Sequence, residues 1–292
     1  MKILVTGRDG QVAQSLAERH GAHELVFAGR PDLDLADPGS IERTVAAVNP
    51  ELVISAAAYT AVDKAEDEPE LAMAVNGEGP GALARAAAKL GAPVIHFSTD
   101  YVFDGSLDRP WREDDRVAPL GVYGATKLVG EQAVAASRAT YAILRTAWVY
   151  SPFGANFVKT MLRVAETRDA LNVVEDQFGC PTSALDIADG IMAVVAGLQN
   201  GRGGNAIYHL AGTGETHWAD FARAIFAESA QRGGPTAEVT GIPSSGYPTR
   251  ATRPANSRLD CTRMAKTFGW RAPRWQDSLG VVMDRLVGTR TA

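Results

Sequence analysis

Short apolar runs alternate with amphipathic segments along the first half of the chain. Five runs rich in Val, Ile, Leu and Ala are typical of strands buried on both faces, at residues 2–5, 24–29, 51–58, 93–99 and 141–150. Between them, apolar residues recur at helical spacing, at residues 11–20, 40–49, 69–91 and 122–137. Ser40 is expected to cap the second helix, and the third is expected to be interrupted near residues 76–81. The alternation predicts βαβ units, and therefore an α/β fold with a Rossmann-like, doubly wound parallel sheet.

The rhythm becomes irregular after about residue 150. Helical spacing continues in three segments, at residues 156–166, 185–198 and 217–231. One strand-like run lies among them, at residues 205–212. Residues 242–257 are rich in Pro, Ser, Thr and Arg and are expected to be too polar for the core. We predict a dinucleotide-binding domain over 1–150, with segments returning from the second half. A smaller, mixed substrate domain is predicted mainly over 151–292, with a cleft between the two.

The composition mainly excludes certain classes of function. The chain has 292 residues and a formal net charge of -5, which argues against binding to nucleic acid or to an anionic membrane. Cys180 and Cys261 lie far apart and form no CxxC pair, as is typical of free thiols in a reducing compartment. The first residues do not resemble a signal peptide, and every apolar run is shorter than the roughly 20 residues of a membrane helix. We therefore expect a cytoplasmic protein.

A glycine-rich loop, VTGRDGQVA, follows the first predicted strand and opens the first predicted helix. Gly7 permits a tight turn, and Gly10 lets a pyrophosphate approach backbone N–H groups at the helix N-terminus. Ala13 is small enough for close packing of the helix on the strand. The same letters occur in ordinary turns, but at the start of a βαβ series they indicate dinucleotide binding.

The second predicted strand ends near Arg30, where NAD-binding proteins usually carry an acid that holds the adenosine ribose. An arginine there suits a 2′-phosphate and favours NADPH over NADH. Asp32 or Asp34 would instead take the ribose if Arg30 were simply a solvated loop residue. NADH therefore stays open as an alternative cofactor.

Tyr123 and Lys127 are four residues apart at the start of a predicted helix, so both face the same space. The preceding strand ends with Thr99 and Asp100, and ligands bind at the carboxyl ends of parallel strands. A phenol exchanges protons poorly at neutral pH unless its charged form is stabilised, as a nearby ammonium or a hydroxyl hydrogen bond would do. Thr99, Tyr123 and Lys127 therefore predict a proton relay beside a nicotinamide cofactor.

The glycine loop, the STD triplet and YxxxK together resemble the extended short-chain dehydrogenase/reductases. Seven blocks in matching order are similar, within that group, to the dTDP-4-dehydrorhamnose reductase family: AAYTAVDKAEDEPELA, FSTDYVFDG, PLGVYGATKLVGE, RTAWVY, NFVKTML, DQFGCPTSALDIA and PTRATRPANSRLD. The resemblance covers nearly the whole chain. It implies NAD(P)H-dependent reduction of the C4 ketone of dTDP-4-dehydro-β-L-rhamnose to dTDP-L-rhamnose, the last step of dTDP-rhamnose synthesis.

The resemblance also implies roles for individual residues. Tyr123 would protonate the developing C4 alkoxide, Lys127 would lower the pKa of Tyr123 and hold the nicotinamide ribose, and Thr99 would tune the proton transfer. The cofactor would lie along the glycine loop, the second strand end and the cleft floor, near Gly7, Gly10, Gln11, Val12, Arg30, Asp34, Leu35, Ala58, Tyr59, Thr60 and Phe97. The sugar would meet Thr99, Asp100 and Trp148.

Several polar or aromatic residues have an alternative, structural interpretation. Trp148 is either core or, because it follows a strand end, a wall against the sugar. Arg250 and Arg253 either face water or clamp the nucleotide diphosphate, which planar guanidinium groups suit. Asp63, Lys64 and Glu66 are either a solvated helix start or lie beside the substrate, with the two interpretations about even. His96 and His209 are expected to be packed within apolar strands, without a role.

Partners and competing functions complete the sequence-based picture. We expect a dTDP-sugar substrate and a monomer or homodimer. Some family members are said to join subunits through magnesium held by glutamates, but the corresponding position here is Ser15, so no metal is predicted. One alternative is a nucleotide-sugar epimerase or epimerase-reductase on the same scaffold. Another is a non-catalytic regulatory subunit of a methionine adenosyltransferase.

Overall fold

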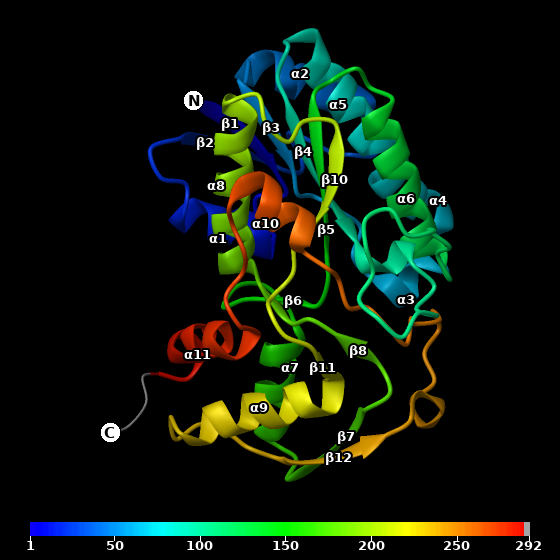
Figure 1. The fold of residues 1–292 in the computed structure, drawn as a ribbon, viewed down its shortest axis with the longest axis vertical. Helices are drawn as coiled ribbons and strands as arrows, with labels where there is room; N and C mark the ends of the chain where they lie inside the picture. Colours follow the sequence, from blue (N-terminus) through cyan, green and yellow to red (C-terminus); the bar gives the residue numbers. More distant parts are fainter. Residues whose placement is uncertain (289–292) are drawn as a thin grey trace.

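The computed structural model describes residues 1–288, and its centre is a parallel sheet with the strand order β10-β5-β4-β3-β1-β2 (Figure 1). The six strands are β1 (Lys2–Thr6), β2 (Glu24–Ala28), β3 (Leu52–Ser55), β4 (Val94–Thr99), β5 (Tyr141–Thr146) and β10 (Ala206–His209). The chain reverses its direction of travel across the sheet between β1 and β3, and ligands bind at such switch points, beyond the carboxyl ends of the strands. The predicted doubly wound parallel sheet is confirmed.

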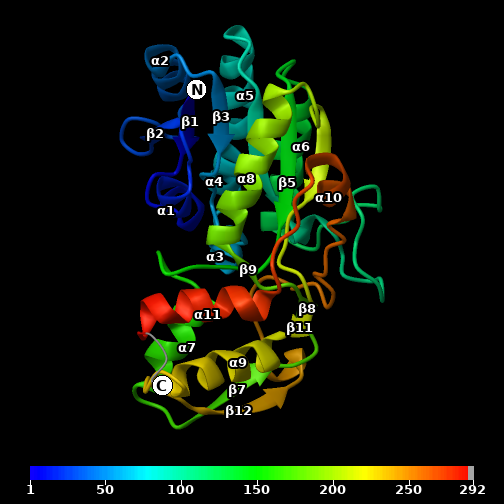
Figure 2. The ribbon, with the colours of Figure 1, turned by 60° about the vertical axis from the view of Figure 1, so that its left-hand side comes forward.

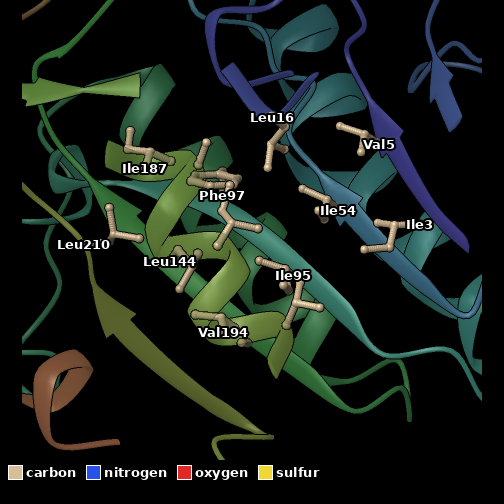
Figure 3. Close-up of a cluster of buried hydrophobic side chains, with 14 of the residues drawn as sticks. Ile3, Val5, Leu16, Ile54, Ile95, Phe97, Leu144, Ile187, Val194 and Leu210 are labelled. Carbon is tan, nitrogen blue, oxygen red and sulfur yellow. The ribbon is translucent and has the colours of Figure 1, made fainter. Parts of the chain in front are cut away.

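Helices cover both faces of this sheet (Figures 1 and 2). One face carries α1 (Gln11–Glu18), α8 (Ala184–Gln199) and α10 (Thr262–Phe268). The other carries α2 (Pro38–Val48), α5 (Gly79–Lys89) and α6 (Val122–Ala135). Figure 3 shows how Ile54 and Ile95 of the sheet pack with Val194 of α8, all fully buried. Burial of each such side chain stabilises the fold by about 1.5–3 kcal/mol. The packing also fixes the sheet edge at which the site forms.

The second half of the chain forms a smaller layered part below the sheet (Figure 2). There β7 (Ala170–Val174) pairs in parallel with β12 (Glu238–Ile242), and a separate apolar cluster joins this pair to three helices, α7 (Phe157–Ala165), α9 (Trp218–Ala230) and α11 (Trp275–Leu286). Short paired strands lie between the two parts, β6 (Val149–Tyr150) with β9 (Thr182–Ser183) and β8 (Phe178–Gly179) with β11 (Thr216–His217). Within residues 1–288, no helix is long and apolar enough to cross a bilayer.

The predicted N-cap of α2 is wrong. Asp37 is the N-cap, and its Oδ1 accepts a hydrogen bond from Gly39 N at 2.9 Å. The helix begins earlier than expected because Pro38 has the fixed φ that suits a first helical position. Ser40 lies inside the helix and donates to Asp37 O at 2.8 Å.

The predicted interruption near residues 76–81 is a π-helical turn, so the chain stays helical. The order is α3 (Val62–Ala65), α4 (Pro69–Met73), the π-turn η1 (Ala74–Glu78) and α5. A Cβ at Gly79 would lie 2.5 Å from Leu35 O, so this glycine serves close packing rather than a break. The π-turn matters for the site because such turns are frequent where function needs an unusual side-chain direction.

Two further sequence-based expectations are corrected. Residues 141–150 do not form one strand, because Trp148 has a left-handed backbone with a φ of 49° and separates β5 from β6. The segment after β12 includes the short turn η3 (Ser244–Gly246) and is exposed at first, yet Asn256 and Ser257 are buried. Asn256 Nδ2 donates to Leu107 O at 2.7 Å, which satisfies the buried amide and draws a polar segment into the interior.

Candidate active site

The end of β4 places the first group of polar side chains. Thr99 caps the 3-10 turn η2 (Asp100–Val102), where its Oγ1 accepts from Tyr101 N at 3.2 Å and donates to Asp100 Oδ1 at 3.0 Å. Asp100 is buried, and among the described residues its Oδ2 has no hydrogen-bond partner. A buried carboxylate oxygen without a donor is ready to accept a hydroxyl from a ligand.

Helix α6 brings Tyr123 and Lys127 to the same place. A Cβ at Gly124 would lie 2.1 Å from Tyr101 O, so only glycine lets this helix approach η2 so closely. The rings of Tyr101 and Tyr123 meet edge to face, with centroids 5.6 Å apart. Glu66 of the segment after α3 accepts a hydrogen bond from Val122 N at 2.8 Å, which anchors the start of α6.

The pKa values of these groups are governed by burial. Burial raises the pKa of Tyr123 to about 12, the charge of Asp100 adds to the rise, and a hydrogen bond with Thr99 opposes it. Burial also raises the pKa of Asp100 to about 6, against hydrogen bonds with Ser257 and Thr99 that lower it. Burial lowers the pKa of Lys127 to about 8, while the charge of Glu131 raises it. The expected lowering of the Tyr123 pKa by Lys127 is not seen in this structure.

Lys127 lies inside the protein rather than on the helix surface. Its Nζ donates to the carbonyl oxygen of Phe97 on β4. One turn further along α6, Glu131 accepts two hydrogen bonds from Arg145 on β5, from Nε at 2.8 Å and from Nη2 at 2.7 Å. This pair is almost completely buried, so it fixes α6 against the sheet at the level of Lys127.

The glycine loop leads into an uncapped helix start. Gly7 has a φ of 84°, and a Cβ there would lie 3.0 Å from Ala57 Cα, so both backbone and space require glycine. Gly10 is the N-cap of α1, and no side chain caps this helix start. The first N–H groups of α1, including those of Gln11 and Val12, therefore suit an anion. Gln11 Oε1 accepts from Ser151 Oγ at 2.7 Å, so its side chain ties the loop to the second half of the chain.

The end of β2 carries two arginines rather than one. Arg30 is exposed, which fits both a solvated loop residue and a residue that contacts a cofactor phosphate, and Pro31 follows it. Arg8 of the glycine loop, which the sequence analysis missed, donates from Nη2 to Arg30 O at 2.7 Å and lies 3.4 Å from Asp32 Oδ2. Asp34 Oδ1 accepts from Ala36 N, whereas the side chain of Leu35 is in the core.

In the segment after β3, Ala58 and Tyr59 are half-buried and Thr60 is exposed, and their place along a cofactor cleft stays a prediction. Asn76 from the π-turn clamps Tyr59 on both sides, accepting from its N at 2.8 Å and donating to its O at 3.0 Å. The sequence analysis missed Asn76. A polar Asn within an otherwise Ala-rich helical segment could have indicated this role. The π-turn that directs the side chain inward, however, has no sequence signature.

Trp148 is half-buried and stacks on Trp218, with ring centroids 3.5 Å apart and planes inclined by 10°. Its edge lies against Gly179, where a Cβ would be 2.4 Å from Cε2 of the indole. The indole is thus part of the apolar cluster of the second half and also borders the strand ends. The core interpretation fits this packing, and the role of Trp148 as a wall against the sugar stays a prediction.

Arg250 and Arg253 form ion pairs with two aspartates and do not simply face water. Asp63 accepts from Nη1 and Nη2 of Arg253 at 3.0 and 2.7 Å, and Arg250 pairs with Asp67. The hydrogen bonds from Arg253 hold the pKa of Asp63 below its usual value. Lys64 pairs with Glu68 at 2.8 Å, within the same helical segment. The acidic segment is therefore not just a solvated helix start, because it contacts the arginine segment directly.

The remaining candidates do not converge on the cleft. His96 and His209 are fully buried, as expected, with Nδ1 of each engaged by Ser55 and by Trp111 O respectively. Ser15 is also buried and donates to Gln11 O. Among residues 1–288, no group of three or more His, Cys, Asp or Glu side chains is arranged to hold a metal ion.

Comparison with known proteins bears on the whole chain. A family model described as RmlD substrate binding domain matches residues 1–287. The dTDP-4-dehydrorhamnose reductase of Sinorhizobium fredii is 49% identical over 281 residues, covering 95% of each chain. The crystal structure of a dTDP-4-dehydrorhamnose reductase from Clostridium acetobutylicum has a TM-score of 0.91, with 38% identity over 98% of this chain and 99% of that one. The Bacillus anthracis dTDP-4-dehydrorhamnose reductase, crystallised with NADP, has a TM-score of 0.88 and 31% identity over 96% and 98%.

Proposed function

The chain belongs to the RmlD substrate binding domain family, and on that premise we propose that it reduces the C4 ketone of dTDP-4-dehydro-β-L-rhamnose to dTDP-L-rhamnose with NADPH. The observation that carries the proposal is the convergence of Thr99, Tyr123 and Lys127. Thr99 ends β4 and hydrogen-bonds with Tyr123 of α6, and Lys127 of the same helix donates to Phe97 O near the same strand end. This is the arrangement that a proton relay next to a nicotinamide requires.

Tyr123 would deliver the proton. Reduction adds a hydride to C4, which the bound cofactor supplies, and leaves negative charge on the C4 oxygen. The raised pKa of Tyr123 keeps the phenol protonated at neutral pH, so it is present as a donor before the reaction. An alkoxide is a much stronger base than a phenolate, so transfer of this proton to the C4 oxygen is downhill.

Thr99 would stabilise the phenolate that remains on Tyr123, and Lys127 would hold the nicotinamide ribose. The ammonium group of Lys127 lies on the same face of α6, and the hydrogen bond of Thr99 already lowers the pKa of Tyr123. Asp100, with its unpartnered Oδ2, would accept a hydroxyl of the sugar, and Trp148 would border the ring. Arg253 and Arg250 would bind the diphosphate with charge-assisted hydrogen bonds.

The residues at the β2 end favour NADPH. Arg8 and Arg30 together offer two guanidinium groups where a 2′-phosphate would sit, and the uncapped N-terminus of α1 suits the pyrophosphate. Asp32 lies beside Arg8, so NADH remains an alternative at lower affinity. The NADP bound to the Bacillus anthracis relative supports the same preference.

The test is product formation. The purified chain is mixed with NADPH and dTDP-4-dehydro-β-L-rhamnose generated in situ, and the product is identified by mass spectrometry and sugar NMR. Stoichiometric oxidation of NADPH and formation of dTDP-L-rhamnose support the proposal. Conversion without net NADPH oxidation would indicate an epimerase. Binding of cofactor without any conversion would instead direct attention to a regulatory subunit, identified through a co-purifying partner.

A further inference from the structure

Two carboxylates already occupy the arginines that would bind the diphosphate. Asp63 of α3 receives both terminal nitrogens of Arg253 and also accepts from Ala251 N at 3.0 Å. Asp67 pairs through Oδ1 with Nη2 of Arg250. A carboxylate presents the same planar pair of acceptor oxygens to a guanidinium as one phosphate group does. The two aspartates therefore satisfy the arginines much as a bound diphosphate would.

The segment that carries these arginines is closed over Tyr123. Ala251, Thr252 and Pro254 line the same cavity as Tyr123. The volume of that cavity is about 10 Å³, which is close to the minimum for a single water molecule. Figure 1 shows the segment after β12 rising to lie beneath α3. The cavity is too small for a sugar as the described residues stand, so a sugar in it would require this segment or another lining element to move.

The ion pair of Arg250 with Asp67 is weak enough to exchange. The side chains of Arg250 and Asp67 are 62% and 49% exposed, and Asp63 is 46% exposed. Exposed pairs of this kind contribute little because water and salt screen them. A diphosphate carries more negative charge than either carboxylate and engages both arginines at once, so it competes effectively.

We propose that Asp63 and Asp67 are internal competitors for the diphosphate of the substrate, which hold residues 250–254 closed over Tyr123 until a nucleotide diphosphate replaces them on Arg253 and Arg250. The inference rests on the proposed function in one respect, that these arginines bind the diphosphate. It adds that two acidic residues of the same site oppose substrate binding.

Asp67 gives the cleaner test, because Asp63 also holds the backbone of Ala251. The probe is dTDP, titrated calorimetrically onto the full chain at about 50 mM and about 500 mM salt, where screening differs strongly. We expect Asp67→Asn to bind dTDP about two- to five-fold more tightly than wild type at low salt, with the gain reduced at high salt. Arg250→Gln binds dTDP more weakly, and Asp67→Asn in the Arg250→Gln background brings no gain.

The matched control is Asp189→Asn, which removes a similar half-exposed ion pair with Arg19 on α1 and leaves dTDP affinity unchanged. Weaker or unchanged dTDP binding by Asp67→Asn would overturn the inference, because a merely structural ion pair cannot tighten binding when it is lost. The substrate KM should fall in parallel. If the variants bind dTDP as expected but no ketone is reduced, the inference that Asp67 competes with the diphosphate is supported and the proposed reaction is wrong. If the ketone is reduced but Asp67→Asn changes neither the dTDP affinity nor the substrate KM, only the inferred competition is wrong.

Discussion

Gly179 lies against the indole of Trp148 so closely that a Cβ at position 179 would be 2.4 Å from Cε2 and 2.6 Å from Nε1. The glycine is therefore a condition for the position of Trp148. On its other side Trp148 is fixed by the stacked ring of Trp218. Two residues from separate parts of the second half thus hold one aromatic ring at the border of the cleft.

Gly179→Ala should displace Trp148 without a backbone penalty, because Gly179 does not have a positive φ. Overpacking of this kind costs about 1–3 kcal/mol of folding stability. We expect a lower melting temperature, a changed near-UV circular dichroism from the Trp148–Trp218 pair and a several-fold higher KM for the sugar nucleotide. Gly246→Ala is the control, since a Cβ there meets only Ile242 at 3.6 Å. An unchanged spectrum and KM would show that Trp148 is not held in this way.

The pH dependence of kcat/KM should have two limbs. With its pKa raised to about 6, Asp100 becomes protonated below that pH and accepts a sugar hydroxyl less strongly, so activity falls on the acid side. With its pKa lowered to about 8, Lys127 loses its charge above that pH, so activity falls on the alkaline side. The measurement is a pH profile of wild type and Asp100→Asn. The variant should have a lower plateau and no acid limb, and an acid limb that persists would assign it to another group.

Arg30 and Arg8 should affect cofactor binding differently. Arg30→Ala removes a guanidinium that would contact only a 2′-phosphate, so the KM for NADPH should rise by about ten-fold while that for NADH hardly changes. Arg8→Ala should raise both, because Arg8 also holds the carbonyls of Gly29 and Arg30. Arg43→Ala, in a surface pair with Asp37, is the control. Equal effects of Arg30→Ala on the two cofactors would contradict the proposed phosphate contact.

The buried pair of Glu131 and Arg145 should be important for stability. Arg145→Met leaves the carboxylate of Glu131 buried without its partner, which typically costs about 3–5 kcal/mol. We expect the midpoint of urea unfolding to fall strongly. The double variant with Glu131→Met as well should recover part of the loss, because no charge is then left buried. A double variant less stable than the sum of the two single changes would contradict this account.

Much of the sheet could be predicted because its strands are apolar on both faces. The runs at β3 and β4 are uniformly buried and β1 is buried after Lys2, and such runs between amphipathic helices have few alternative folds. The spacing of Tyr123 and Lys127 and the glycine loop after β1 are local features, so they too could be read from the sequence.

Features that depend on close tertiary contact could not be predicted. The π-turn at Asn76 packs on α6 only because Gly130 has no Cβ, which would otherwise lie 2.1 Å from Asn76 O. The polar segment around Asn256 is buried because its amide finds carbonyl partners far away in sequence. The pairing of Asp63 with Arg253 likewise spans 190 positions, and nothing local signals it.

The most direct test of the central claim is the turnover of wild type and Tyr123→Phe, followed as oxidation of NADPH with dTDP-4-dehydro-β-L-rhamnose. A positioned acid typically contributes about 10²–10⁴-fold, so the variant should lose at least two orders of magnitude in kcat while its affinity for NADPH, measured by fluorescence, stays near that of wild type. Tyr141→Phe, at the start of β5, is the matched control and should keep full activity. Turnover by Tyr123→Phe close to that of wild type would show that another group delivers the proton.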